Sequence, residues 1–304
     1  MTPSPALPTN PSPRFIEMQK MEQEQLAAYT PPAVTVQDRV ISGSETNIPI
    51  KIFTPATPAT GLRPIFVWFH GGAFVAGSYQ MGESLYPGYE LAARADAVVI
   101  SVEYRLANDD LRFPAPQVDA FDAVVWARDN AAELRADAAR LFVGGASAGA
   151  CIAGSVSLMA RDRKLGLAGV LPIYPVAHRV SPEHTEPKLA KMGAEEPLGD
   201  NFMVLHNPWL LEQITDYTPE IDSHHCFPGD SPEKGGQSPF LIINADNDAL
   251  RTGGEKWASD LAQAGVQVKV SKEEGTNHGY LNFDPAKTPG AGHTLDLMAE
   301  FIRG

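Results

Sequence analysis

Cysteine is scarce in this sequence: Cys151 and Cys226 are the only two in 304 residues. Two cysteines cannot build a disulfide framework, and neither lies in a zinc-type spacing. His224 and His225 directly precede Cys226, but this spacing is poor for a metal, so we expect no metal site. Because free cysteine side chains are mostly buried, we expect two buried thiols in a reducing compartment and a cytoplasmic protein.

Long hydrophobic runs are also missing, so the sequence predicts no membrane-spanning helix. The proline-rich start, MTPSPALPTNPSPRF, lacks the apolar region of a signal peptide, and we expect none. Basic residues are few, 24 against 37 acidic residues, which gives a formal net charge of −13. This balance disfavours binding to nucleic acid and to anionic membrane surfaces.

The residues that are present suit one large globular domain over residues 1–304, because 43% are hydrophobic and 20% are charged. Residues 34–56 read as two strands around a Ser-Gly turn. The later predicted strands are RPIFVWF, ADAVVISV, ARLFVGG, LAGVLPIYPV, PFLIINAD and VQVKVSKEEG. Helical patterns cover residues 14–29, 117–134, 253–266 and 293–302. Strands that alternate with helices predict an α/β fold, a parallel sheet with helices on both faces.

One serine, Ser147, stands among glycines and alanines in LFVGGASAGACIAG, between a predicted strand and a helical segment. Gly145 and Gly149 allow the backbone to turn sharply at this point. A Gly-x-Ser-x-Gly at a strand-to-helix turn is typical of a nucleophile elbow, in which a strained serine points its oxygen outward. The motif alone also fits a flexible turn. The presence of a base and an acid elsewhere in the sequence must distinguish the two interpretations.

A serine needs a base to take its proton, and that base needs a carboxylate to orient it. His278, which follows the last predicted strand, is the candidate base because histidine titrates near neutrality. The segment NADNDAL offers two candidate acids, Asp246 and Asp248, both near the carboxyl end of a strand. Spacing alone does not choose between them. The chain order serine, aspartate, histidine is the order found on this architecture.

A glycine-rich loop, FHGGAFVAGS, follows an early predicted strand. The amides of Gly71 and Gly72 are candidate donors to an oxyanion, together with the amide of Ala148 directly after Ser147. Taken alone, His-Gly-Gly reads as an ordinary tight turn, and we expect His70 to support the loop rather than to act as a base.

These segments resemble the hormone-sensitive-lipase-like carboxylesterases of the α/β-hydrolase fold. The resemblance runs from about residue 48 to the C-terminus. Its signature segments are HGGAF at 70–74, YRLANDDLRFPAP at 104–116, GGASAGA at 144–150, ADNDALR at 245–251 and NHGYLNF at 277–283. It implies a mostly parallel eight-stranded sheet, helices on both faces, a helical cap and no cofactor.

The resemblance also implies a role for each residue. Ser147 is the nucleophile, Asp248 before ALR is the triad acid, and His278 is the base. Gly71 and Gly72 form the oxyanion hole.

The chain departs from the family pattern at several positions, none of which removes a triad member. Ala73 stands in place of a third glycine, and Ala146 in place of an aspartate before the serine. YRLAND replaces the usual YRLAPE, and Thr252 replaces an acidic residue after ALR. Asp246 matches the acidic residue before the triad acid and is expected to be structural.

By the same resemblance, a cap formed by about residues 1–45 and 179–236 covers a core of about 46–178 and 237–304. The apolar candidates for its lining are Met18, Met21, Phe202, Met203, Leu205, Trp209, Leu210 and Leu211.

The sequence therefore predicts a serine hydrolase that cleaves carboxylic esters of small to medium substrates through an acyl-enzyme on Ser147. An amidase or an acyltransferase uses the same triad and stays open. A non-hydrolytic small-molecule receptor is disfavoured, because related receptors lack the triad histidine whereas His278 is present here. The expected partner is a small-molecule ester, and a homodimer is left open.

Overall fold

The computed structural model describes residues 13–108, 110–184, 186–190 and 225–304. At the centre of these described residues lies an eight-stranded sheet in the order β1-β2-β4-β3-β5-β6-β7-β8. The strands are β1 (Val34–Ser42), β2 (Asn47–Pro55), β3 (Arg63–Phe69), β4 (Val98–Val102), β5 (Ala136–Ala146), β6 (Gly169–Ile173), β7 (Phe240–Asn247) and β8 (Val268–Asn277). β2 runs antiparallel to β1 and β4, and the other neighbours are parallel. The predicted mostly parallel sheet is confirmed.

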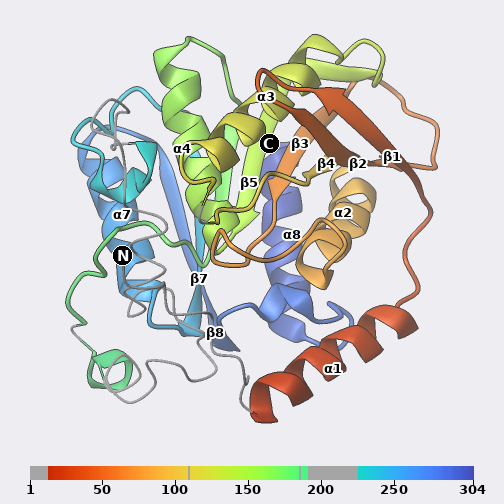
Figure 1. Ribbon diagram of the computed structural model, residues 1–304. Helices are drawn as coiled ribbons and strands as arrows, with labels where there is room; N and C mark the ends of the chain where they lie inside the picture. Colours follow the sequence, from red (N-terminus) through yellow and green to blue (C-terminus); the bar gives the residue numbers. More distant parts are fainter. Residues whose placement is uncertain (1–12, 109, 185, 191–224) are drawn as a thin grey trace.

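Helices cover both faces of the sheet, as predicted (Figure 1). Helices α2 (Gly82–Ala95) and α8 (Pro289–Arg303) pack against one face. Helices α3 (Ala115–Asp129), α4 (Ala148–Asp162) and α7 (Arg251–Gln263) pack against the other. Every residue of β3, β4 and β6 is buried, because each of these strands lies between two apolar layers.

Helix α2 has no counterpart among the predicted helices. Pro87 lies inside it, and Gly88 follows directly. Both residues disfavour a helix interior, so the local pattern hides this element. Gly88 is needed for packing, because a Cβ there would lie 2.5 Å from the Phe53 ring. A signal was nevertheless present: β3 and β4 are parallel neighbours, and a parallel connection requires a crossover that is usually helical.

Near the N-terminus, the predicted helix is present as α1 (Pro13–Ala28), next to α2. The Tyr29 hydroxyl donates to Glu90 Oε1 at 2.6 Å, and the Asp284 amide donates to Gln25 Oε1 at 2.9 Å. These bonds attach the segment to the core, although Met21 is 45% exposed. The sheet then begins at Val34, so residues 34–42 of the predicted cap segment 1–45 belong to the sheet edge.

Of the second predicted cap segment, 179–236, the structure describes residues 179–184, 186–190 and 225–236. The lining candidates from Phe202 to Leu211 lie outside the described residues. Where the segment leaves and rejoins the core, its ends are joined: the Gly229 amide donates to Ala177 O at 2.8 Å, and His178 Nδ1 lies 2.7 Å from Asp230 Oδ1.

Candidate active site

Ser147 lies at the turn from β5 into α4, and it is 5% exposed. Its backbone has φ 55° and ψ −116°, a conformation that costs a non-glycine residue about 1–3 kcal/mol. Two glycines make this turn fit. A Cβ on Gly145 would lie 2.3 Å from Gly149 O, and a Cβ on Gly149 would lie 2.1 Å from Phe69 O. The predicted elbow is therefore present, held by close backbone contact with β3.

The structure brings the predicted nucleophile, base and acid into one chain of hydrogen bonds. The Ser147 Oγ lies 2.8 Å from His278 Nε2, and His278 Nδ1 lies 2.7 Å from Asp248 Oδ2. Asp248 is 1% exposed, and its other oxygen accepts the Leu250 amide at 2.9 Å. Because both carboxylate oxygens accept, Nδ1 carries the proton in this arrangement and Nε2 is free to accept one from the serine.

Two carboxylates influence the charge of His278. Burial alone would lower the pKa of His278, but the charge and hydrogen bond of Asp248 and the charge of Glu83 together raise it above its ordinary value. The rings of Tyr174 and His278 form an edge-to-face contact, with 4.9 Å between their centroids. The surroundings of His278 therefore favour its protonated, imidazolium form.

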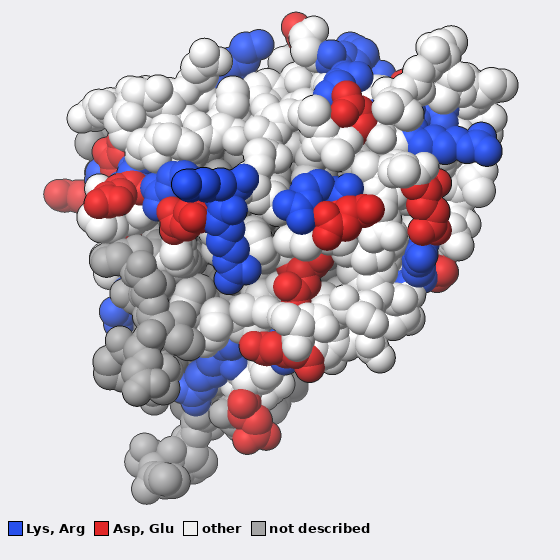
Figure 2. Space-filling view, turned by 90° about the horizontal axis from the view of Figure 1, so that it is seen from above, with Lys and Arg blue, Asp and Glu red and all other residues white. Residues whose placement is uncertain are grey.

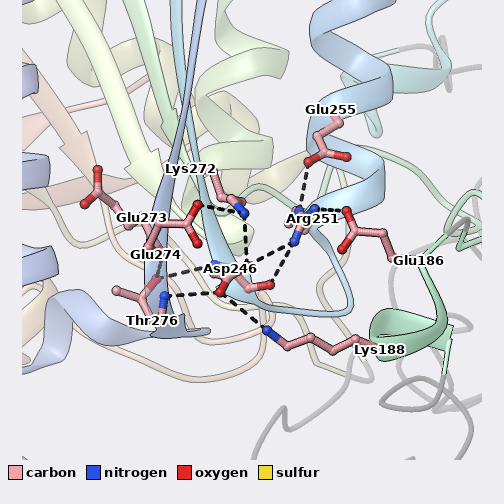
Figure 3. A network of polar contacts seen from close by, with 10 residues as sticks. Glu186, Lys188, Asp246, Arg251, Glu255, Lys272, Glu273, Glu274 and Thr276 are labelled. Carbon is pink, nitrogen blue, oxygen red and sulfur yellow. Dashed lines mark hydrogen bonds and ion pairs between the residues drawn. The ribbon is translucent and has the colours of Figure 1, made fainter.

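Asp246 belongs to a different set of contacts (Figure 3). It accepts from Lys272 at 3.2 Å and from Lys188 at 3.4 Å, and its Oδ1 lies 3.2 Å from Arg251. Burial would raise the pKa of Asp246, but the hydrogen bonds from the Gly275 amide, Lys272 and Lys188 outweigh it and lower the pKa. Of the two aspartates that spacing alone could not separate, the imidazole contacts Asp248.

The same network joins part of the predicted cap to the end of β7 and the start of α7, on either side of Asp248. Arg251 is 5% exposed and pairs with Glu186 and Glu255 as well as with Asp246 (Figure 3). Beside it, His184 Nδ1 lies 2.9 Å from the Thr252 hydroxyl. His184, Glu186 and Lys188 thus each contact a residue at the end of β7 or the start of α7.

The glycine-rich loop after β3 departs from the expectation at Gly71. Its amide, predicted to face an oxyanion, donates instead to Glu83 Oε2 at 2.7 Å. The next residues, Gly72 and Ala73, have positive φ angles of 114° and 55°, so the backbone turns sharply here. Ala148 is the first residue of α4. The first amides of a helix have no hydrogen-bond acceptor within the helix, so the Ala148 amide has none there.

His70 has the supporting role that the sequence predicts. It is fully buried and stacks on Tyr104 with 4.3 Å between ring centroids. Its Nδ1 lies 2.6 Å from Gly71 O, and the Tyr104 hydroxyl donates to His70 O at 2.7 Å. Burial lowers the pKa of His70 to about 4, so the ring stays neutral near pH 7 and holds the loop.

Both cysteines are buried and neither is in a disulfide, and the Cys151 thiol donates to Cys226 O at 3.1 Å. Within the described ranges, no group of three or more His, Cys, Asp and Glu side chains has a metal-binding arrangement. None of the helices in the described part of the chain has the length and apolarity that crossing a membrane requires. On the face in Figure 2, lysines and arginines lie among acidic residues rather than in one continuous patch.

Known proteins resemble this chain in sequence and in structure. A family model described as alpha/beta hydrolase fold matches residues 66–282. The chain is 32% identical over 276 residues to carboxylesterase NlhH of Mycobacterium tuberculosis, covering 88% of this chain and 83% of that one. It is 28% identical over 277 residues to an arylesterase of Saccharolobus solfataricus, covering 88% and 85%. The solved structure of EstE1, a thermophilic carboxylesterase cloned from a metagenomic library, matches with a TM-score of 0.79 at 31% identity, covering 96% and 97%.

Proposed function

The chain belongs to the α/β-hydrolase family of carboxylesterases, and we propose that it hydrolyses carboxylic esters of small to medium size through an acyl-enzyme on Ser147. The observation that carries this proposal is the hydrogen-bond chain from Ser147 through His278 to Asp248. A strained serine with a matched base and a buried acid is suited to nucleophilic attack on an ester carbonyl.

In the first half of the reaction, His278 takes the proton of Ser147 as the serine oxygen attacks the carbonyl carbon. We assign the oxyanion donors to the amides of Gly72, Ala73 and Ala148, because the Gly71 amide is bonded to Glu83. His278 then gives its proton to the departing alcohol, which leaves an acyl group on Ser147.

In the second half, water attacks the acyl carbonyl while His278 acts as base again. The oxyanion of this second tetrahedral intermediate accepts hydrogen bonds from the same amides. The intermediate then collapses and releases the carboxylic acid, while His278 gives the proton it took from water to the Ser147 oxygen. Throughout both halves, Asp248 keeps the imidazole in the tautomer that can accept at Nε2.

Other predictions are left to experiment. Amide cleavage and acyl transfer need the same triad. They differ from ester hydrolysis in the reacting molecules and not in the catalytic residues. A receptor without hydrolysis would not need the bonded His278. The two buried cysteines, neither of them in a disulfide, support a cytoplasmic location. A homodimer stays an untested prediction.

A series of p-nitrophenyl esters from acetate upward tests the proposal. We expect the wild-type chain to turn over these esters. The acyl length of the best substrate then indicates the size of the pocket that binds the acyl group. Ser147→Ala should lose turnover while it keeps its melting transition. Ser155→Ala is the matched control, because this buried serine on the same helix only donates to Cys151 O, at 3.0 Å. Full activity in a folded Ser147→Ala variant would remove the enzyme assignment.

A further inference from the structure

Beside the triad lies a second buried carboxylate that the reaction outlined above does not use. Glu83, on α2, is 2% exposed, and none of the described Lys or Arg side chains forms an ion pair with it. An unpaired carboxylate in the interior is costly unless it accepts hydrogen bonds. Glu83 has two: the Gly71 amide donates to Oε2 at 2.7 Å, and the Tyr174 hydroxyl donates to Oε1 at 2.6 Å.

Both bonds are of the kind that an ionised carboxylate accepts. A backbone amide can only donate, and the Tyr174 hydroxyl donates its hydrogen to the other carboxylate oxygen. Burial raises the pKa of Glu83, while the bonds from Tyr174 and Gly71 and the charge of His278 oppose that rise. A protonated His278 therefore favours an ionised Glu83.

Glu83 contacts both the oxyanion loop and the surroundings of His278. On one side, it fits closely against the oxyanion loop: a Cβ on Gly71 would lie 2.5 Å from Glu83 Oε2. On the other side, it bonds Tyr174, whose ring lies against His278 and whose backbone has φ 37°. The Glu83 amide also donates to Asn282 Oδ1 at 3.1 Å, in the loop that follows the histidine.

We propose that Glu83 is a positioning residue of the esterase reaction, an inference that rests on the proposed function. It holds the Gly71 amide so that the amides of Gly72 and Ala73 face the reacting carbonyl. Its negative charge joins that of Asp248 in stabilising the imidazolium of His278 in the transition state.

Removing only the charge separates this role from packing. Glu83→Gln keeps the size of the side chain and an acceptor for Gly71, but it has no negative charge. We expect kcat to fall by about tenfold, with KM within about twofold, because the lost interaction is made in the transition state. The acid limb of the kcat/KM profile should move to lower pH, since a histidine with one anion fewer beside it loses its proton more readily.

The pH readout has to allow for every titratable group around Glu83. Glu22 on α1, Tyr104 after β4, Tyr174 after β6 and His278 after β8 all interact with it electrostatically. The two tyrosine hydroxyls stay protonated because burial raises the pKa of each well above its ordinary value. A Glu22→Gln variant therefore tests whether the acid limb belongs to Glu22 instead.

Two further variants sharpen the experiment. Tyr174→Phe removes one donor to Glu83 and should lower kcat and shift the acid limb in the same direction. Glu90→Gln is the matched control on the same helix, because Glu90 bonds Tyr29 and Arg94 instead. Glu83→Asp keeps the charge but shortens the reach, so it should restore the acid limb and only part of kcat.

The outcomes decide between the two proposals. A folded Glu83→Gln variant with wild-type kcat and an unmoved acid limb would overturn this inference alone. If that variant does not fold, the same two measurements on Tyr174→Phe decide. An acid limb that moves in Glu22→Gln but not in Glu83→Gln would also overturn it. A wild-type chain that turns over no ester would instead refute the proposed function.

Discussion

Replacing Asp248 with asparagine keeps the shape of the acid and changes what it can accept. In the structure, one carboxylate oxygen accepts His278 Nδ1 at 2.7 Å and the other accepts the Leu250 amide at 2.9 Å. An asparagine has a single oxygen for these two donors. If its NH₂ group faces His278, the imidazole proton moves to Nε2, which then cannot accept from Ser147. If the NH₂ group faces Leu250, two buried donors oppose each other.

The size of the loss follows from this mismatch. The same substitution in a serine-protease triad lowers kcat by about 10⁴ through the wrong tautomer. Asp248 is equally buried and directly bonded here, so we expect Asp248→Asn to lose at least about a hundredfold in kcat, which is about 2.7 kcal/mol of transition-state stabilisation. Loss of its charge also removes the strongest influence that raises the pKa of His278.

Asp246→Asn is the matched control, two residues away in the same loop. Its side chain bonds Lys272, Lys188 and Arg251 rather than the imidazole, so kcat should fall by less than about tenfold. The pKa of Asp246 is lowered in the folded chain, so its stabilising effect is present at neutral pH and is lost as pH falls through that lowered pKa. The assay is kcat on a p-nitrophenyl ester, with a melting curve for each variant. The reverse ranking in two folded proteins would refute the reasoning.

Three other outcomes follow from the structure. Gly149→Ala places a Cβ 2.1 Å from Phe69 O, so chemical denaturation should show a loss of about 3 kcal/mol or more, and an unchanged stability would contradict the close contact at the elbow. Ser147→Gly relieves a strained φ of 55° and should raise the melting temperature while it abolishes turnover; a lower melting temperature would argue against strain. Removing residues 1–30 deletes α1 and the Tyr29 bond to Glu90, and it should damage turnover of a short and a longer ester more than it lowers the melting temperature; unchanged kinetics on both would mean that α1 does not cover the site.

The proposed triad was within reach of sequence reasoning because its residues lie in short local patterns. Gly145 and Gly149 mark the elbow, since a side chain at either position would not fit between β5, α4 and the backbone of Phe69. The choice of Asp248 over Asp246 needed the resemblance to a family, because two residues of spacing at a strand end carry no geometric information. The contact with His278 Nδ1 supplies that information in three dimensions.

The parts that sequence reasoning missed depend on contacts between distant segments. Nothing local indicates that Glu83 would turn the Gly71 amide away from an oxyanion, because the partners belong to a loop and to a helix hidden by Pro87. Tyr174 lies near the end of a predicted strand and belongs to no motif, yet its hydroxyl donates to Glu83. Conversely, the predicted cap segment 1–45 overlaps β1, because its boundary came from the family resemblance and not from the strand pattern that residues 34–56 already show.

Covalent labelling tests the central claim most directly, the claim that Ser147 is the nucleophile. An organophosphate reacts with a serine that a neighbouring base activates, and peptide mapping then locates the adduct. We expect one adduct, on the peptide that contains Ser147, with loss of esterase activity in proportion to labelling and no adduct in Ser147→Ala. Labelling at a different residue, together with full activity in Ser147→Ala, would contradict the account.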